Sequence, residues 1–212
     1  MQTSEPAPGP SVSRRAEYAK ATKAAIIAAA RELFAQRGYV STKVDDIAER
    51  ARVAPATVYA VTGGKQGLLH ALVDEWTAAP EVDEAHRAIA SLEDSRAIIA
   101  EVASLTRRMR RDWGDVMRIV LATAPLDESA AATLQLATER YRGGLRAAAE
   151  RLAALDALAP DVSVDDATDM LWFFFGYASF FTLIDDNGWS PERTAGWLQQ
   201  MAIGSLLGEA AR

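Results

Sequence analysis

The chain has 212 residues, of which 50% are apolar and 25% charged, the ordinary composition of a globular protein with a buried core. It contains no cysteine, which excludes disulfide bonds, thiolate nucleophiles and cysteine-ligated zinc or iron–sulfur clusters. The net charge of −6 is unevenly divided, because residues 14–65 carry ten lysines and arginines against five acidic residues. All four lysines lie in this basic part: Lys20, Lys23, Lys43 and Lys65. The division predicts a basic part that approaches nucleic acid and an acidic remainder that phosphate repels.

Residues 1–13 are rich in proline and small polar residues and contain no apolar run. This composition is not that of a signal peptide, and it predicts a disordered tail. We therefore expect a cytoplasmic protein whose folded part begins near residue 14.

The first expected helix covers residues 14–36. Gly38 follows it and supplies the left-handed residue that commonly ends a helix. The apolar residues of the segment recur at helical spacing and form one face: Ile26, Ile27, Ala30, Leu33 and Phe34.

Residues 41–65 predict two short helices joined by a tight turn. Thr42 and Asp45 have the spacing of a capping box, so the first helix is expected to begin near Lys43 and to end around residues 50–52. Pro55 suits the first position of a second helix, expected over residues 55–61. Such a pair is a helix-turn-helix, whose second helix enters the major groove of DNA.

The second helix of this pair has the surface of a recognition helix. Ala56, Thr57 and Tyr59 present small or hydrogen-bonding groups on its outer face, which permits close approach to base edges. A turn through Gly63 and Gly64 then leads to Lys65 at the start of another helix, where the ammonium and the helix N-terminus both favour phosphate. The expected DNA contacts are Thr42, Lys43, Pro55, Ala56, Thr57, Tyr59 and Lys65.

The segment from Lys20 to Leu72 resembles the N-terminal domain of TetR-type transcriptional regulators. Two positions depart from the family pattern, since Ala54 stands where a serine usually caps the recognition helix and Thr62 where a phenylalanine is usual. The residues that carry the resemblance are Ile26, Ala30, Phe34, Gly38, Tyr39, Thr42, Val44, Ile47, Ala48, Val53, Thr57, Val58, Tyr59, Lys65 and Leu68.

Beyond residue 65 the sequence indicates helices and no strand pattern. We expect helices over residues 66–77, 81–90, 92–111, 112–124, 128–156, 164–185 and 191–209, with Ser163 and Ser190 as N-caps. The expected fold class is all-α, with about nine helices. A helix-turn-helix DNA-binding domain covers residues 14–64, and a larger domain for effector binding and dimerisation covers residues 65–212. The helix over residues 66–77 connects them, and its last aromatic residue, Trp76, is expected to lie beside the second domain.

Residues 171–184 are apolar on every side, although fourteen residues are too few to span a bilayer, which takes about 20. A helix of this kind must be covered on two sides, here by its own core and by a second subunit. The resemblance implies the same arrangement, because TetR-type proteins dimerise through their last two helices. The expected interface residues are Phe174, Ala178, Phe181, Trp197, Met201 and Gly204.

The resemblance also implies an effector pocket enclosed by the middle helices, and apolar and aromatic residues supply its expected walls. We expect the pocket at Trp113, Met117, Leu121, Thr138, Tyr141, Trp172 and Phe175. Arginines that can orient an acidic ligand there are Arg108, Arg111 and Arg142. For any single one of these residues, an ordinary place in the core or on the surface is the commoner alternative, and the prediction depends on the cluster.

The sequence contains no nucleophile elbow, Walker loop or dinucleotide fingerprint. A di-iron site needs two carboxylate–histidine motifs, and Asp83 with His86 is the one weak candidate. We therefore expect neither an enzyme nor a bound metal or cofactor. The expected function is a DNA-binding transcriptional regulator. We expect a repressor that binds double-stranded operator DNA as a homodimer. A small apolar or aromatic effector is expected to release the protein from the DNA, and no membrane is expected to take part. The alternative is a ligand-independent DNA-binding or helical interaction protein.

Overall fold

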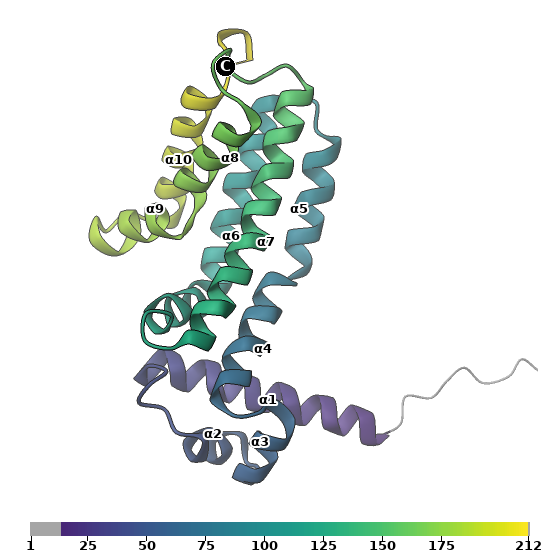
Figure 1. Cartoon of the computed structure of the whole chain (residues 1–212), viewed down its shortest axis with the longest axis vertical. Helices are drawn as coiled ribbons and strands as arrows, with labels where there is room; N and C mark the ends of the chain where they lie inside the picture. The colour runs from purple at the N-terminus through teal and green to yellow at the C-terminus, as the bar shows by residue number, and fades with distance from the viewer. Residues whose placement is uncertain (1–13, 212) are drawn as a thin grey trace, which may run out of the picture. The chain divides into compact units, whose positions relative to one another are not determined.

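The computed structural model describes residues 14–211, and the expected tail at residues 1–13 lies outside them. Within the described residues there are ten α-helices, a π-helical turn, a 3₁₀ turn and no strand, which confirms the all-α prediction (Figure 1). The chain divides into two compact units between Ala71 and Leu72. The helices are α1 (Arg14–Arg37), α2 (Val44–Ala51), α3 (Pro55–Thr62), α4 (Lys65–Thr77), α5 (Pro80–Ser91), α6 (Ser95–Thr123), α7 (Glu128–Ala154), α8 (Val164–Phe175), α9 (Tyr177–Phe181) and α10 (Pro191–Leu206). The π-helical turn is Thr182–Asp186, and the 3₁₀ turn is Glu209–Ala211.

The first unit is built by α1, α2 and α3, which pack on one another, followed by the first residues of α4. α1 ends as expected at Gly38, whose φ is +80°. The rings of Phe34 and Tyr39 lie 5.1 Å apart and join α1 to the turn that follows it. The buried side chains shared by the three helices are Ile26, Ala30, Phe34, Ile47, Ala48 and Val58. The predicted helix-turn-helix is therefore present, with its apolar faces turned inward.

The start of α2 differs from the prediction. The carboxylate that reaches back belongs to Asp46, which accepts from the Lys43 amide at 3.0 Å, and not to Asp45. Thr42 precedes the helix, and its hydroxyl donates to the carbonyls of Gly38 at 2.8 Å and Leu33 at 3.3 Å. The predicted capping box was thus one residue too early, because Thr42 is engaged in closing the turn after α1.

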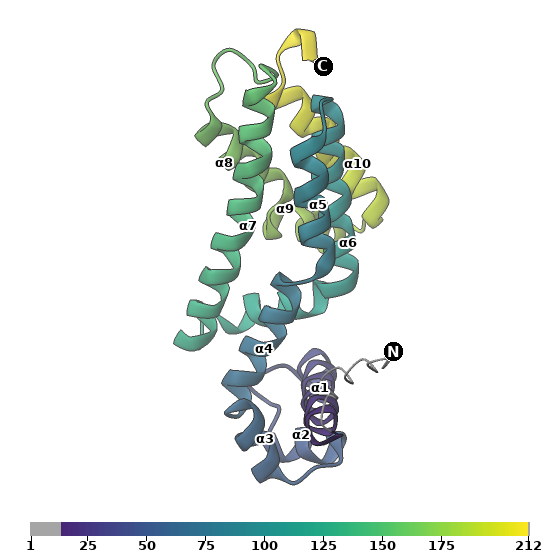
Figure 2. The ribbon, with the colours of Figure 1, turned by 90° about the vertical axis from the view of Figure 1, so that its right-hand side faces the viewer.

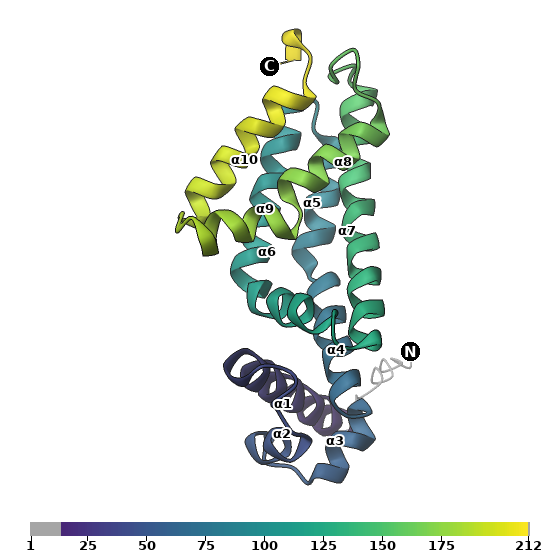
Figure 3. The same cartoon turned by 60° about the vertical axis from the view of Figure 1, so that its left-hand side comes forward.

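The second unit is a helical bundle in which α6 and α7 are the long central members. α5 packs on both of them, as Figure 2 shows. α8 packs on α7, and α10 packs on α6 and α8 (Figure 3). Side chains from α6, α7, α8 and α10 form one continuous core that includes Ile98, Leu145, Leu171 and Leu198. Ser163 and Ser190 cap α8 and α10 as predicted, accepting from the amides of Asp166 and Arg193.

Two predicted helix boundaries were wrong. α6 continues without interruption past Asp112, because its buried residues keep their helical spacing from Met109 to Val120. The helix expected over residues 164–185 instead breaks at Gly176, whose ψ of −176° is extended. A side chain there would place its Cβ 2.4 Å from the Trp172 carbonyl oxygen, so the glycine permits the close turn into α9.

The helical stretch Val164–Asp186 is 23 residues long and, by length and composition alone, could cross a membrane. It is longer than the fourteen-residue apolar run seen in the sequence. Leu171, Phe175, Phe180 and Leu183 from this stretch are part of the core of the second unit. Core helices of soluble proteins pass the same test of length and composition, so the stretch is weak evidence for a membrane span.

Gly67 lies in the first turn of α4, where a Cβ would stand 1.6 Å from the backbone carbonyl oxygen of Thr62. Because a backbone atom cannot move aside as a side chain can, we expect Gly67→Ala to destabilise the protein by about 1 to 3 kcal/mol. Thermal unfolding followed by circular dichroism measures the loss.

Gly143→Ala is the matched control, since this helical glycine has no heavy atom within 4 Å of the added Cβ. The control is expected to gain about 0.5 to 1 kcal/mol. Equal changes in the two variants would contradict the steric account.

Candidate functional site

The candidate DNA-binding surface is formed by the start of α2 and the exposed side of α3. Lys43, Pro55 and Ala56 are exposed, and Thr57 is half-buried. Val58 faces inward and is fully buried, which fixes the rotation of α3. The sequence therefore predicted correctly which side of α3 is turned outward.

Tyr59 and Lys65 lie on either side of the turn that joins α3 to α4. The Tyr59 side chain is 58% exposed, and its ring lies 3.1 Å from the position that a Cβ on Gly64 would take. Gly64 has a φ of +90°, so the turn between the two helices depends on glycine. The Lys65 ammonium lies 4.4 Å from the centre of the Tyr39 ring and donates to the Val40 carbonyl at 3.3 Å.

Thr42 does not belong to this surface. Its side chain is 1% exposed, and its hydroxyl donates into the turn after α1. The prediction that Thr42 contacts DNA through its side chain is therefore corrected.

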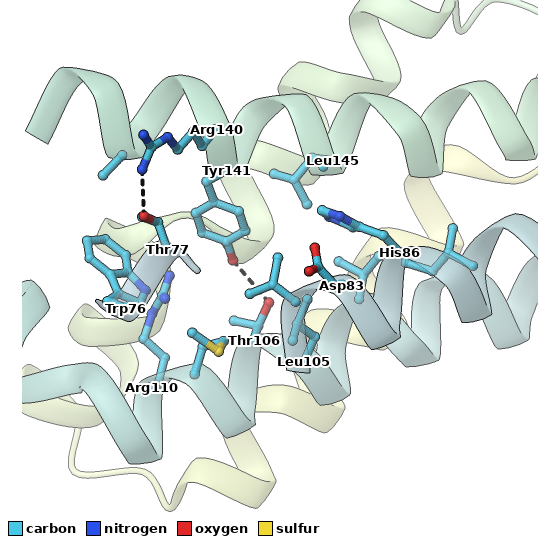
Figure 4. A pocket seen from close by; sticks show the side chains of 16 residues that line it. Trp76, Thr77, Asp83, His86, Leu105, Thr106, Arg110, Arg140, Tyr141 and Leu145 are labelled. Carbon is cyan, nitrogen blue, oxygen red and sulfur yellow. Dashed lines mark hydrogen bonds between the residues drawn. The ribbon is translucent and has the colours of Figure 1, made fainter. Parts of the chain in front are cut away.

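The second unit contains a cavity of about 220 Å³ enclosed by the end of α4 and by α5, α6 and α7. About 10–15 Å³ is enough for one water molecule, so the space has room for a small organic molecule. Figure 4 shows Trp76, Thr77 and Arg110 toward one end and Asp83 and His86 toward the other. The apolar part of the wall consists of Trp76, Val82, Ile89, Val102, Leu105, Met109, Ala137 and Leu145.

Of the seven predicted pocket residues, Tyr141 lines this cavity. Its hydroxyl donates to the Phe175 carbonyl at 2.7 Å and lies 3.1 Å from the Thr106 hydroxyl. The other six are not part of its wall. Met117 and Phe175 are fully buried in the core, whereas Trp113, Leu121, Thr138 and Trp172 are half-buried. The prediction named the wrong end of α6, because helical spacing shows which face is apolar and not where along the helix a cavity opens.

Arg110 is the wall residue that the sequence reasoning missed. Its side chain is 6% exposed and rises from α6 toward Trp76 (Figure 4). One guanidinium nitrogen, Nη2, donates to the Phe175 carbonyl at 3.1 Å, and Nη1 lies 3.0 Å from the Met117 sulfur. Arg110 follows Met109 by one residue and Thr106 by four, and both of these are buried. This helical spacing in the sequence could have placed Arg110 on the inner face of α6.

The three arginines predicted to orient a ligand have carboxylate partners instead. Arg108 pairs with Glu101 at 2.9 Å and Arg111 with Asp112 at 2.7 Å. Arg142 pairs with Asp169. Asp83 and His86 both line the cavity, but within residues 14–211 no group of three acidic or histidine side chains could hold a metal ion.

Residues 26–72 match the family of bacterial regulatory proteins described as the tetR family. The match covers the N-terminal DNA-binding domain alone, and it supports the predicted resemblance to TetR-type transcriptional regulators. Regulators of this family are DNA-binding proteins and not enzymes. No curated protein matches the chain significantly.

Solved structures of other proteins share the fold over nearly the whole chain. A complex of SmeT with triclosan is 18% identical and has a TM-score of 0.75, covering 91% of this chain and 94% of that one. A protein named as a transcriptional regulator from Saccharomonospora viridis, in complex with choline, is 16% identical with a TM-score of 0.74, covering 90% and 100%. A protein named as a TetR-family regulator from Mesorhizobium loti is 16% identical with a TM-score of 0.61, covering 90% and 98%.

The residues predicted for a dimer interface fall into two groups. Trp197, Met201 and Gly204 lie on the exposed side of α10, and Ala178 is exposed on α9. Phe174 and Phe181 are half-buried. The most exposed aromatic residue of α8 is Phe173 at 69%, which the prediction did not name.

Tyr177 stands beside Arg110, whose guanidinium carbon lies 5.3 Å from the centre of its ring. Burial raises the pKa of the Tyr177 hydroxyl from 10.0 to about 12, against the lowering effects of Thr138 and of the Arg110 charge. The folded state holds this proton more tightly than the unfolded state does. The hydroxyl therefore makes its full contribution to the free energy of unfolding below pH 10, and this contribution is lost as the pH rises toward 12. A two-unit shift corresponds to about 2.7 kcal/mol.

We therefore expect the free energy of unfolding, measured with urea, to fall between pH 9 and pH 11.5 for the wild type. The fall should be roughly 2 kcal/mol larger than for Tyr177→Phe. Phenylalanine keeps the ring and removes only the ionisable hydroxyl, so the comparison isolates the titration of Tyr177. Equal losses would mean that Tyr177 ionises as readily in the folded as in the unfolded protein.

Proposed function

We propose that this tetR-family regulator is a repressor that acts as a homodimer in the cytoplasm and leaves its operator when a small molecule fills the cavity of the second unit. The observation that carries the proposal is the composition of the cavity wall, which includes Trp76 and Thr77 at the end of α4. The same helix begins at Lys65, beside the candidate DNA-binding surface. A ligand that displaces Trp76 therefore acts on a helix that also reaches the DNA-binding residues.

The DNA-binding role is assigned to Lys43, Pro55, Ala56, Thr57, Tyr59 and Lys65. Thr57 and Ala56 are proposed to face base edges, since α3 is short and its exposed side carries few bulky groups. Lys65 and Tyr59 are proposed to hold phosphate. An ammonium has three N–H donors, so the contact of Lys65 with Val40 is compatible with this role.

Release requires that the effector bind the two arrangements of the dimer with different affinities. Recognition helices on a two-fold operator stand about one DNA turn apart, roughly 34 to 36 Å. A shift of a few ångströms at α4 is then enough to lose one half-site. The cavity wall is mostly apolar, which supports a small and largely apolar effector. Two solved structures with the same fold, the SmeT complex with triclosan and the Saccharomonospora viridis protein with choline, hold small molecules and support an effector of this size.

The dimer is proposed to form through α8 to α10. Phe173, Trp197 and Met201 expose apolar surface on these helices, and Gly204 has no heavy atom within 4 Å of an added Cβ. Such a glycine permits a helix of a second subunit to approach closely. Exposed apolar patches on soluble proteins commonly mark an interface.

The DNA-binding assignment is tested by Lys65→Ala and Thr57→Val, measured by fluorescence anisotropy on operator and random DNA at several salt concentrations. Lys65→Ala is expected to weaken both kinds of binding and to lower the salt slope by about one, because a phosphate contact is lost. Thr57→Val is expected to change the preference among operators by about 1 to 3 kcal/mol at one position. If Lys65→Ala altered sequence preference and left the salt slope unchanged, the two roles would be wrongly assigned.

The dimer is tested by Met201→Glu, which places a charge in the proposed interface. We expect sedimentation at micromolar concentration to show a wild-type mass near twice 22.9 kDa and a dimer weakened by roughly 3 kcal/mol or more in the variant. Leu126→Glu is the matched control, since this leucine is 74% exposed in the connection between α6 and α7. A monomeric wild type, or equal loss of dimer in both variants, would remove α10 from the interface.

A further inference from the structure

Arg110 brings a buried positive charge to the wall of the cavity. Among residues 14–211 no ion pair involves Arg110, and its Nε is buried without a hydrogen-bond partner. Its two hydrogen-bond acceptors are a carbonyl and a thioether, neither of which carries a negative charge. A buried cation without a counter-ion is costly, so proteins rarely keep one unless something else supplies the charge.

Aromatic rings hold the Arg110 guanidinium in place without neutralising it. Its central carbon lies 5.3 to 5.8 Å from the ring centres of Tyr141, Tyr177, Phe180 and Phe181. Ring faces attract a cation but leave its net charge unchanged. Because the pKa of Tyr177 is raised, this neighbour stays neutral at ordinary pH and does not act as the counter-ion.

The other charged groups near Arg110 are already paired. Arg140, at the same end of the cavity, donates to the Thr77 hydroxyl at 2.8 Å and lies 3.5 Å from Asp74. Arg110 also borders a smaller hollow of about 110 Å³, where Arg107, Arg111 and Arg118 pair with Glu192, Asp112 and Asp185. The unpaired charge therefore belongs to Arg110, which lines the larger cavity.

We propose that the cavity binds an amphipathic organic monoanion, a carboxylic acid whose carboxylate pairs with Arg110 and whose hydrocarbon part lies along the apolar wall. This inference rests on the proposed function and narrows its effector from any small apolar molecule to a lipophilic acid. An arginine fork matches a carboxylate, and Nε supplies a donor that the protein leaves unused.

The arrangement of the wall gives the ligand one orientation. Along α6 the wall runs from Arg110 through Thr106 and Leu105 to Val102, a span of about 12 Å at 1.5 Å per residue. Asp83 lines the end away from Arg110 in Figure 4 and would repel a carboxylate there. The acid group therefore lies near Trp76 and Arg110, and the hydrocarbon part extends toward Leu145.

The experiment compares octanoate and decanoate with the primary alcohols of the same length and with decyltrimethylammonium, all titrated into the full-length dimer. Calorimetry and Trp fluorescence report binding without DNA, since Trp76 lines the cavity. We expect each carboxylate to bind at least about tenfold more tightly than its alcohol, because a charge-assisted hydrogen bond replaces an unmade one. Equal affinity of acid and alcohol, tighter binding of the cation, or no binding of either acid below millimolar concentration would overturn the proposal.

Substitutions locate the carboxylate. Arg110→Gln is expected to abolish the preference for the acid while the alcohol still binds, and Arg110→Lys is expected to retain part of it. Arg140→Gln is the matched control, a cavity arginine already paired, and should keep the full preference. If the control lost the preference and Arg110→Gln kept it, the anion would bind at Arg140 instead. If Arg110→Gln fails to fold, the wild-type ligand series and Arg110→Lys still decide the question.

Operator affinity measured in the presence of decanoate distinguishes the proposed ligand class from the proposed repressor mechanism. Binding that depends on Arg110 but leaves operator affinity unchanged would support the ligand class and refute release by the effector. Release of the operator by the alcohol as readily as by the acid would retain the repressor mechanism and refute the ligand class.

Discussion

A helix that stops inside a protein core leaves carbonyl groups that water cannot reach, and the second unit depends on how this is resolved at Phe175. Gly176 breaks the helical stretch there, and the freed carbonyl accepts from the Tyr141 hydroxyl and from Arg110 Nη2. Three helices, α6, α7 and α8, are thereby joined at one oxygen atom. The hydroxyl and the guanidinium that satisfy it also line the cavity, so the same hydrogen bonds that stabilise the bundle fix the polar groups of the candidate effector site.

This connection positions a positive charge at one end of the cavity. An arginine side chain is long and flexible, but here the aromatic rings and the Phe175 carbonyl hold it in one place. A preorganised donor spends little conformational entropy when a ligand arrives. The neighbouring hydroxyls of Tyr141 and Thr106 bond to each other or to the backbone, and Arg140 in the same wall pairs with Asp74, whereas Arg110 forms no ion pair among the described residues.

Local signals in the sequence were sufficient for much of the fold. Gly38, Ser163 and Pro191 act through their own backbone geometry or their nearest neighbours, and each marks a helix end where it was predicted. The break at Gly176 was missed because its cause is tertiary: the carbonyl it frees is satisfied by residues 34 and 65 positions away along the chain. The cavity was misplaced for a similar reason, since Trp113 and Met109 have equivalent places in a helical pattern and packing by α5 decides which of them borders a space. The resemblance to TetR-type proteins gave the architecture correctly but carried no information about Arg110.

The recognition helix α3 begins at Ala54 without a side-chain cap, and Pro55 has no amide hydrogen to contribute. The Thr57 amide donates to the Ala54 carbonyl at 2.9 Å, so a backbone carbonyl and not a side chain closes the first turn. The start of α3 therefore depends on the fixed backbone angle of Pro55 and on the burial of Val58 in the first unit. The helix that carries the proposed base contacts is thus held in place by packing more than by its own end.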